Sequence, residues 1–312
     1  MQNNKMILNN YQIIGLDIGR KNTKVYSEFN GEEYSAIFSS IIGDGRNIKF
    51  DDYKDPIYID VDGVDYFVGE LAEKESYSPT RNSSDSKVSL TAKILVHSAI
   101  SKIAKCDRIR VVFGVPNNAY RKQVLLSIIE EYQGKTIKVK DKISNTSKTV
   151  LIEMVDIFRE GDAVCYDVMR DRINVDKDVA FISIGFRTSE ISYFEKGMNF
   201  IDRLSKTIPY GNQHILSYVQ NKLKENNIVK ELHDIDSNIR DYDKFKKEAY
   251  NLASESFTQK IETIIENGFV MTDVYVAGGT ILHLSLDTRF NIVDNPIMSV
   301  SRGLAYVGAL IF

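Results

Sequence analysis

The sequence has few of the residues that mark several protein classes. It has no tryptophan, five prolines and two cysteines in 312 residues, and no run of about 18 apolar residues. Cys106 and Cys165 lack the spacing of a zinc or redox pair, so we expect reduced thiols in a cytoplasmic protein. The first ten residues lack the apolar stretch of a signal peptide, and no spanning helix or other membrane contact is expected.

An excess of positive charge is missing as well. The formal net charge is -3, which argues against direct nucleic-acid binding through a general basic surface. With 43% hydrophobic and 27% charged residues, the composition is that of a globular protein. The length indicates roughly two domains of about 150 residues.

Strand-like and helix-like segments alternate along the chain, which predicts an α/β architecture. The polar stretch 73–87 is typical of a surface loop, and the charged stretch 226–249 is interpreted as solvated helix and loop. Strands are predicted at 11–18, 23–29, 34–41, 108–115, 178–184 and 273–277, and a hairpin around Asp62-Gly63. Helices are predicted at 88–105, 118–132, 212–224, 243–267 and about 296–312.

One pattern occurs twice. Residues 14–31 (IGLDIGRKNTKVYSEFNG) align without gaps on residues 180–197 (AFISIGFRTSEISYFEKG), at a constant offset of 166. Each copy predicts a strand, a tight turn with glycine, a second strand and a glycine that ends the hairpin. Two ordinary hairpins with chance similarity are the alternative, but the shared register and glycines favour two duplicated domains.

The first copy carries the residues Asp17, Gly19, Asn22 and Lys24. Glycine lets the backbone approach a phosphate closely, and N–H groups of the turn can donate to phosphate oxygens. Asp17 can hold Mg²⁺ through water, and Asn22 and Lys24 can reach phosphate. The alternative for Asp17 is a turn-capping aspartate.

The second copy and a later glycine pair extend this prediction. Gly185 and Thr188 occupy the second turn, where Thr188 is a candidate phosphate ligand. Gly278, Gly279 and Thr280 end the apolar strand at 273–277, where the glycines would let a nucleoside lie against the backbone. A tight strand–helix turn is the alternative. One hairpin from each domain would then hold a polyphosphate in a cleft.

In this order, the two hairpins and the V-x-V-A-G-G-T segment resemble the actin-like ATPase superfamily. The helix predicted at 88–105 and four further segments resemble its ParM/StbA group of plasmid-segregation actins, and the resemblance spans nearly the whole chain. These segments are Phe67-Val68-Gly69-Glu70, Gly114-Val115-Pro116, Pro209-Tyr210-Gly211 and Ser301-Arg302-Gly303-Leu304.

The resemblance implies a two-domain actin-like fold with a nucleotide cleft between duplicated domains. Domain I would span 1–176, with an insertion subdomain at about 32–90 and the C-terminal helix at about 296–312 returning to it. Domain II would span 177–295. It also implies head-to-tail filaments that bind ATP or GTP with Mg²⁺, slow hydrolysis that destabilises them, and an adaptor DNA-binding protein that links them to a plasmid centromere.

The same resemblance assigns roles to single residues. Asp17 matches the magnesium-side aspartate, Lys24 matches the family lysine, and Glu160 matches a glutamate that positions magnesium and water. A solvated glutamate at a helix start is the alternative for Glu160. Ser183 stands where the second hairpin normally has an aspartate that orients water, and a hydroxyl is no carboxylate base near neutral pH. We therefore expect slow hydrolysis.

Two other functions stay open. A sugar or small-molecule kinase shares the superfold, although the chain lacks the cysteine-rich zinc motif of the repressor-like kinases. A non-hydrolysing actin-like scaffold is the structural alternative, and Ser183 favours it. An Hsp70-type chaperone would need a longer chain with a peptide-binding domain.

Overall fold

The computed structural model describes residues 10–50, 52–170, 176–237, 242–266 and 268–312. The prediction that there is no signal peptide concerns the first ten residues, of which only Asn10 lies within these ranges. The chain forms two compact units. One contains Met1–Val115, Ala119–Arg159 and Ser301–Phe312, and the other contains Pro116–Asn118 and Glu160–Val300. We call them unit 1 and unit 2 and describe each by itself.

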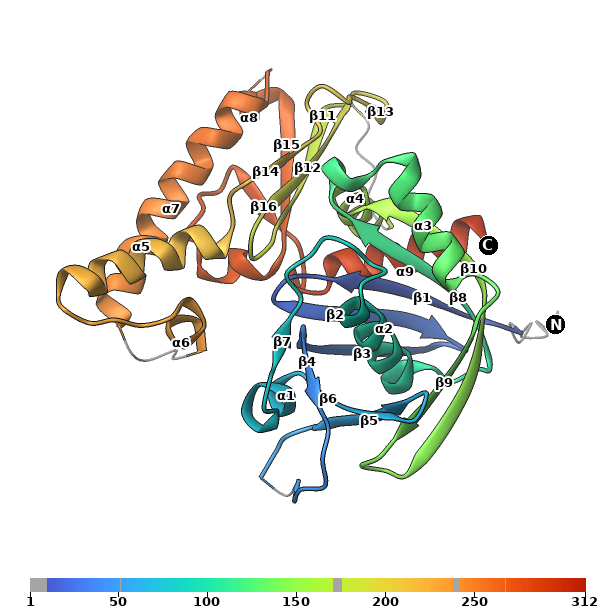
Figure 1. Ribbon diagram of the computed structural model, residues 1–312. Helices are drawn as coiled ribbons and strands as arrows, with labels where there is room; N and C mark the ends of the chain where they lie inside the picture. Colours follow the sequence, from blue (N-terminus) through green and yellow to red (C-terminus); the bar gives the residue numbers. More distant parts are fainter. Residues whose placement is uncertain (1–9, 51, 171–175, 238–241, 267) are drawn as a thin grey trace. The chain divides into compact units, whose positions relative to one another are not determined.

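Unit 1 is built on a ten-stranded sheet (Figure 1). The strand order is β3-β2-β1-β8-β10-β9-β5-β6-β4-β7, in which β1 runs antiparallel to β2 and parallel to β8. The strands are β1 (Gln12–Ile18), β2 (Asn22–Phe29), β3 (Glu32–Ser39), β4 (Ile41–Asp44), β5 (Ile57–Val61), β6 (Val64–Val68), β7 (Thr80–Arg81), β8 (Arg108–Val115), β9 (Thr136–Asp141) and β10 (Thr146–Arg159). Its helices are α1 (Glu70–Glu75), α2 (Leu90–Ile103), α3 (Lys122–Tyr132) and most of α9 (Ser299–Ile311).

Helices cover the central strands of unit 1 on both faces. Alternate residues of β1, such as Ile14 and Leu16, share the main hydrophobic core with α2 and α3, since side chains alternate across a strand. Tyr132 of α3 stacks on Phe113 of β8 with ring centroids 5.0 Å apart. On the other face α9 packs so closely that a Cβ on Gly15 would lie 2.0 Å from the carbonyl oxygen of Ser301.

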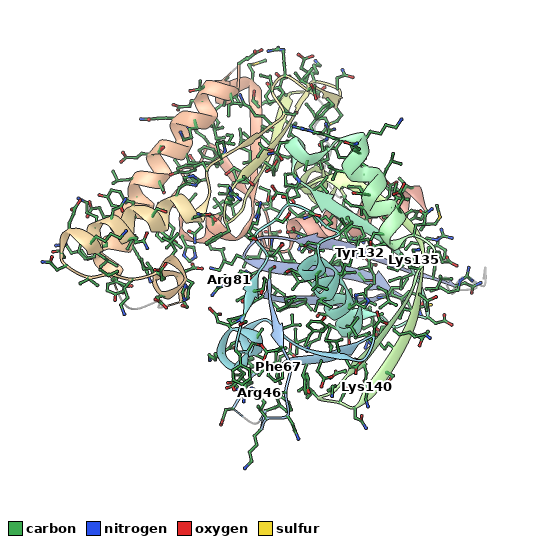
Figure 2. The ribbon with its side chains drawn as sticks, in the orientation of Figure 1. Arg46, Phe67, Arg81, Tyr132, Lys135 and Lys140 are labelled. Carbon is green, nitrogen blue, oxygen red and sulfur yellow. The ribbon has the colours of Figure 1, made fainter. Side chains whose placement is uncertain are left out.

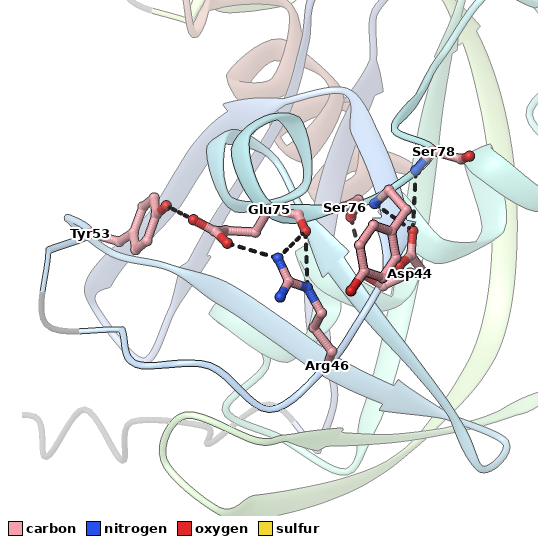
Figure 3. A network of polar contacts seen from close by, with 7 residues as sticks. Asp44, Arg46, Tyr53, Glu75, Ser76 and Ser78 are labelled. Atoms are coloured by element: carbon pink, nitrogen blue, oxygen red, sulfur yellow. Dashed lines mark hydrogen bonds and ion pairs between the residues drawn. The ribbon is translucent and has the colours of Figure 1, made fainter.

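The insertion in unit 1 has a small core of its own around Phe67, which is fully buried (Figure 2). β5 and β6 form the predicted hairpin, and Asp62 and Gly63 both take positive φ, as a type I′ turn requires. A polar network ties the end of α1 to β4 (Figure 3). In it Arg46 donates to the carbonyl and the carboxylate of Glu75, while Asp44 accepts the N–H groups of Tyr77 and Ser78.

Unit 2 is built on a six-stranded sheet with the order β13-β12-β11-β15-β16, in which β14 also pairs with β12. Helices α5 and α7 share one hydrophobic core with this sheet, and α4 contacts β11 and β12. The strands are β11 (Asp178–Ile184), β12 (Ser189–Glu195), β13 (Asn199–Phe200), β14 (Lys206–Ile208), β15 (Thr272–Ala277) and β16 (Phe290–Ile292). The helices are α4 (Glu160–Met169), α5 (Asn212–Glu225), α6 (Leu232–Ser237), α7 (Asp243–Ile264), α8 (Gly268–Met271) and the 3-10 segments η1 (Asn117–Ala119) and η2 (Gly279–His283).

The structure confirms the internal repeat. Asp17 faces Lys24 in the first hairpin, and Ser183 faces Glu190 at the same register in the second. The first strand of each hairpin also pairs in parallel with a later strand, β8 in unit 1 and β15 in unit 2. The offset of 166 therefore relates the strand pairing within the two hairpins as well as their sequences.

Three local predictions were wrong in detail. The helix predicted at 118–132 is a 3-10 turn followed by α3, and a 3-10 segment rather than a longer helix follows the glycine pair. The stretch 73–87 is only partly a surface loop, because Asn82 and Lys87 are each 4% exposed. Their burial depends on contacts with residues more than sixty positions earlier.

Cys165 of α4 is buried. Loss of hydration raises the pKa of its thiol to about 12, so the nucleophilic thiolate is not populated near neutral pH. Among the described residues, Cys106 and Cys165 form no disulfide. Within the same ranges, the apolar helices fall short of the length and hydropathy needed to cross a bilayer.

The contact between Gly15 and α9 yields a stability prediction. Gly15→Ala should lower the free energy of unfolding by roughly 3 kcal/mol, since its methyl group overlaps backbone atoms rather than a flexible side chain. Leu310→Ala on the exposed side of α9 is the control, because this side chain is 74% exposed. Urea denaturation of both variants tests this, and equal stability would show that α9 does not pack there.

Candidate phosphate-binding site

The first hairpin turn brings its predicted residues together. The Gly19 N–H donates to the carbonyl of Asn22 at 3.1 Å, which closes the turn between β1 and β2. Lys24 Nζ lies 2.7 Å from Asp17 Oδ2, and both side chains are largely buried. Asp17, Gly19, Asn22 and Lys24 thus form one cluster, in which a carboxylate and an ammonium sit beside a glycine turn.

Two residues that we did not predict donate hydrogen bonds to the backbone of this turn. Asn82 Nδ2 donates to the Gly19 carbonyl at 3.1 Å, and Lys87 Nζ donates to the Ile18 carbonyl at 2.9 Å. A carbonyl oxygen that is hydrogen-bonded on the protein side is not available to repel an anionic ligand. The polar composition of the segment gave no signal, because nothing in it shows which polar residues become buried.

The second hairpin turn closes in the same way. The Gly185 N–H donates to the carbonyl of Thr188 at 2.9 Å. The carbonyl of Gly185, equivalent to that of Gly19, accepts from the Thr280 hydroxyl at 2.8 Å and from the Asn212 N–H at 3.2 Å. Thr280 is 4% exposed, so its hydroxyl positions the turn. Gly185, Thr188 and Thr280 thus meet at the start of α5.

The two glycines after β15 meet different surroundings. Gly278 has φ of 96°, and a Cβ there would lie 2.3 Å from the Ile184 carbonyl oxygen, so the fold itself requires glycine. A Cβ on Gly279 would meet no atom within 4 Å. The open surface at Gly279 leaves room for a ligand against the backbone.

A tyrosine and an asparagine continue this region away from the turn. Tyr250 of α7 donates its hydroxyl proton to Asn212 Oδ1 at 2.8 Å, and its ring stacks on His283 of η2 with centroids 5.0 Å apart. Burial raises the pKa of Tyr250 to about 12, so it remains a donor at neutral pH. Asn212 follows the Pro209-Tyr210-Gly211 segment, which was the only sequence signal for it.

The acidic residue of the second hairpin, Glu190, accepts hydrogen bonds from other residues of unit 2. Glu190 Oε2 accepts the Asn117 N–H at 2.9 Å and the Thr207 hydroxyl at 2.6 Å, and the residue is 1% exposed. Ser183, on the neighbouring strand, is 7% exposed. Glu190 therefore anchors backbone and hydroxyl groups within unit 2, and neither residue places a solvent-accessible carboxylate at this hairpin.

Glu160 is the first residue of α4 and is half-buried. The next residues fix its place, because a Cβ on Gly161 would lie 2.5 Å from Ser192 Oγ and the Ser192 hydroxyl donates to Asp162 Oδ1 at 2.6 Å. The helix start is thus held against β12. Glu160 lies in unit 2, whereas Asp17 lies in unit 1.

The donor set fits a magnesium ion that is bound largely by its substrate. Within the described ranges, no three His, Cys, Asp or Glu side chains gather into a metal-binding group. Mg²⁺ keeps several waters and takes one or two carboxylates together with substrate phosphates. Asp17, beside the glycine turn, is the carboxylate suited to that arrangement.

Known proteins are similar to this chain in the sequence of one segment and in fold over nearly its whole length. Residues 15–161 match the family model of the N-terminal domain of actin-like proteins. A non-polymerisable quadruple mutant of pCBH ParM is 21% identical with a TM-score of 0.79, covering 96% of this chain and 100% of that one. None of the curated protein sequences matches the chain.

Two further solved structures are similar over nearly their whole length. ParM of Bacillus thuringiensis with ATP is 16% identical with a TM-score of 0.67, covering 96% of this chain and 99% of that one. The Alp12 filament structure is 18% identical with a TM-score of 0.66 and the same coverages.

With its paired glycine hairpins and α/β sheets, the chain has an actin-like fold, and residues 15–161 are similar to the N-terminal domain of actin-like proteins. This confirms the actin-like fold that the sequence predicted, and the same fold is found in ParM and in Alp12.

The contrast between the glycines yields a second prediction. Gly278→Ala should destabilise the protein by about 3 kcal/mol, since it combines a positive φ with a backbone clash. Gly279→Ala should change stability by less than about 0.5 kcal/mol. Thermal melting without ligand measures both, and equal losses would contradict the assignment of Gly279 to an open surface.

Proposed function

We propose that this protein binds Mg–ATP or Mg–GTP on its glycine turns, assembles head to tail into filaments and hydrolyses the nucleotide slowly. Assembly would serve plasmid segregation through an adaptor DNA-binding protein that links filaments to the centromere. The observation that carries the proposal is the pair of equivalent hairpins, each closed by a glycine N–H and held by donors to its glycine carbonyl. The ATP in the B. thuringiensis ParM structure and the filament of Alp12 support it.

The residues of each turn have distinct parts in this proposal. In unit 1, Gly19 lets the backbone approach the phosphate closely, Asn22 reaches the phosphate, Lys24 supplies positive charge, and Asp17 holds magnesium. In unit 2, Gly185 and Thr188 form the second phosphate turn, Thr280 fixes it, and Gly279 admits the nucleoside, while Gly278 allows the close packing against Ile184. Magnesium, when bound, would neutralise charge on the phosphates.

Hydrolysis requires a residue that orients water, and Glu160 is the proposed one. Ser183 lacks a carboxylate, and the Glu190 carboxylate accepts hydrogen bonds from Asn117 and Thr207. A general base typically contributes 10²–10⁴-fold to a rate. With one carboxylate in place of two, we expect slow turnover and filaments that persist until hydrolysis weakens them.

Nucleotide binding is tested at Gly279. Gly279→Val should abolish the rise in melting temperature that MgATP or MgGTP gives the wild type, because its branched carbons occupy the open backbone surface. Its melting temperature without nucleotide should stay near that of the wild type. An equal ligand-induced rise in both proteins would rule out nucleoside binding there.

Hydrolysis is tested by phosphate release recorded together with light scattering. Glu160→Gln keeps the size of the side chain but removes its charge, and should lower the rate about 10²-fold or more while filaments outlive those of the wild type. Ser183→Asp should be neutral or faster, since it restores a carboxylate. Hydrolysis by Glu160→Gln at the wild-type rate would show that another residue orients the water.

Sedimentation separates the proposal from its two alternatives. Pelleting only with nucleotide supports a nucleotide-driven filament. Pelleting with nucleotide but without phosphate release would favour the non-hydrolysing scaffold. Sugar-dependent transfer of phosphate, without pelleting, would favour a kinase.

A further inference from the structure

A buried lysine donates a hydrogen bond to the backbone at the first hairpin turn. Lys87 is 4% exposed, and its ammonium donates to the Ile18 carbonyl at 2.9 Å. The Tyr132 hydroxyl donates to the Lys87 carbonyl at 2.6 Å and so fixes the backbone that carries the ammonium. Burying an ammonium is costly unless a negative charge accompanies it.

The carboxylates of Asp17, beside this turn, and of Asp85, two residues before Lys87, already have partners. Asp17 pairs with Lys24 at 2.7 Å, and Asp85 pairs with Arg20 at 2.7 Å. Among the described residues, the buried ammonium of Lys87 therefore has no carboxylate as its ion-pair partner.

The second hairpin shows that an ammonium is not needed to hold such a turn. The Gly185 carbonyl is held by two neutral donors, the Thr280 hydroxyl and the Asn212 N–H. The Ile184 carbonyl, equivalent to that of Ile18, packs against Gly278. A charge at Lys87 thus exceeds what the architecture of the hairpin requires.

A second observation at the same turn points to a ligand. Asn82 is 4% exposed, and while its Nδ2 donates to Gly19, its Oδ1 has no hydrogen-bond partner among the described residues. Leaving a buried acceptor without a donor costs stability. A water that accompanies a bound ligand would satisfy it.

We propose that Lys87 is a positioning residue that supplies the buried positive charge for the polyphosphate at the first turn. Asn82 Oδ1 accepts a hydrogen bond from water brought with that ligand. This inference rests on the proposed nucleotide function and deepens it. Lys87 acts through the Ile18 carbonyl and through its charge, in addition to the residues of the hairpin itself.

The test compares Lys87→Met with the wild type. Met keeps most of the volume and removes the charge, so the nucleotide-free variant should melt at the same temperature or higher. Its affinity for MgATP and MgGTP should fall about 10- to 100-fold, because the polyphosphate loses the attraction of one positive charge buried near the turn. Lys87→Arg, which keeps the charge, should bind better than Lys87→Met.

Lys93→Met is the matched control, because it removes the same charge from α2, where Lys93 pairs with Glu131 and is about one-third exposed. It should bind nucleotide as the wild type does. If the wild type binds and Lys87→Met binds equally well, the inference is wrong and the proposed function stands. If Lys87→Met melts lower, Lys87 is only a structural brace and the inference is also overturned. If the wild type binds neither nucleotide, both the proposed function and the inference fall.

Discussion

The hydrogen bonds that the rest of each unit directs at the carbonyl of one turn glycine are the constraint on which this structure depends. In unit 1 this carbonyl is that of Gly19, held by Asn82; in unit 2 it is that of Gly185, held by Thr280 and Asn212. In both units the donors come from segments far away in the sequence. The fold brings Asn82 of the insertion, Thr280 of η2 and the N–H group at the start of α5 within hydrogen-bond distance of these turns.

The two hairpins pair their strands in the same register but carry different charged residues at the equivalent positions. At the equivalent cross-strand position, unit 1 has the ion pair Asp17–Lys24, whereas unit 2 has Ser183 opposite Glu190. The Glu190 carboxylate serves the packing of unit 2 through Asn117 and Thr207. Duplication thus preserved the turn while the charged residues suited to phosphate and magnesium lie at the first copy.

The strands and the two glycine turns could be predicted from the sequence, because they depend on residues that are close together along the chain. Alternating apolar residues predict the strands, and glycines that recur at a fixed offset predict both turns and their register. The donors to the turn carbonyls could not be found this way. Asn82 and Lys87 lie in a polar stretch that is typical of a loop, and only the folded chain brings them to Gly19 and Ile18. The engagement of Glu190 by Asn117 was hidden for the same reason, since 73 residues separate them.

The proposed function depends on nucleotide binding by these glycine turns. Equilibrium titration of the wild-type protein with fluorescent ATP and GTP, with and without magnesium, tests it most directly. We expect saturable binding that magnesium strengthens and that the unlabelled nucleotide displaces. Absence of saturable binding of either nucleotide up to about 1 mM, with magnesium present, would contradict it.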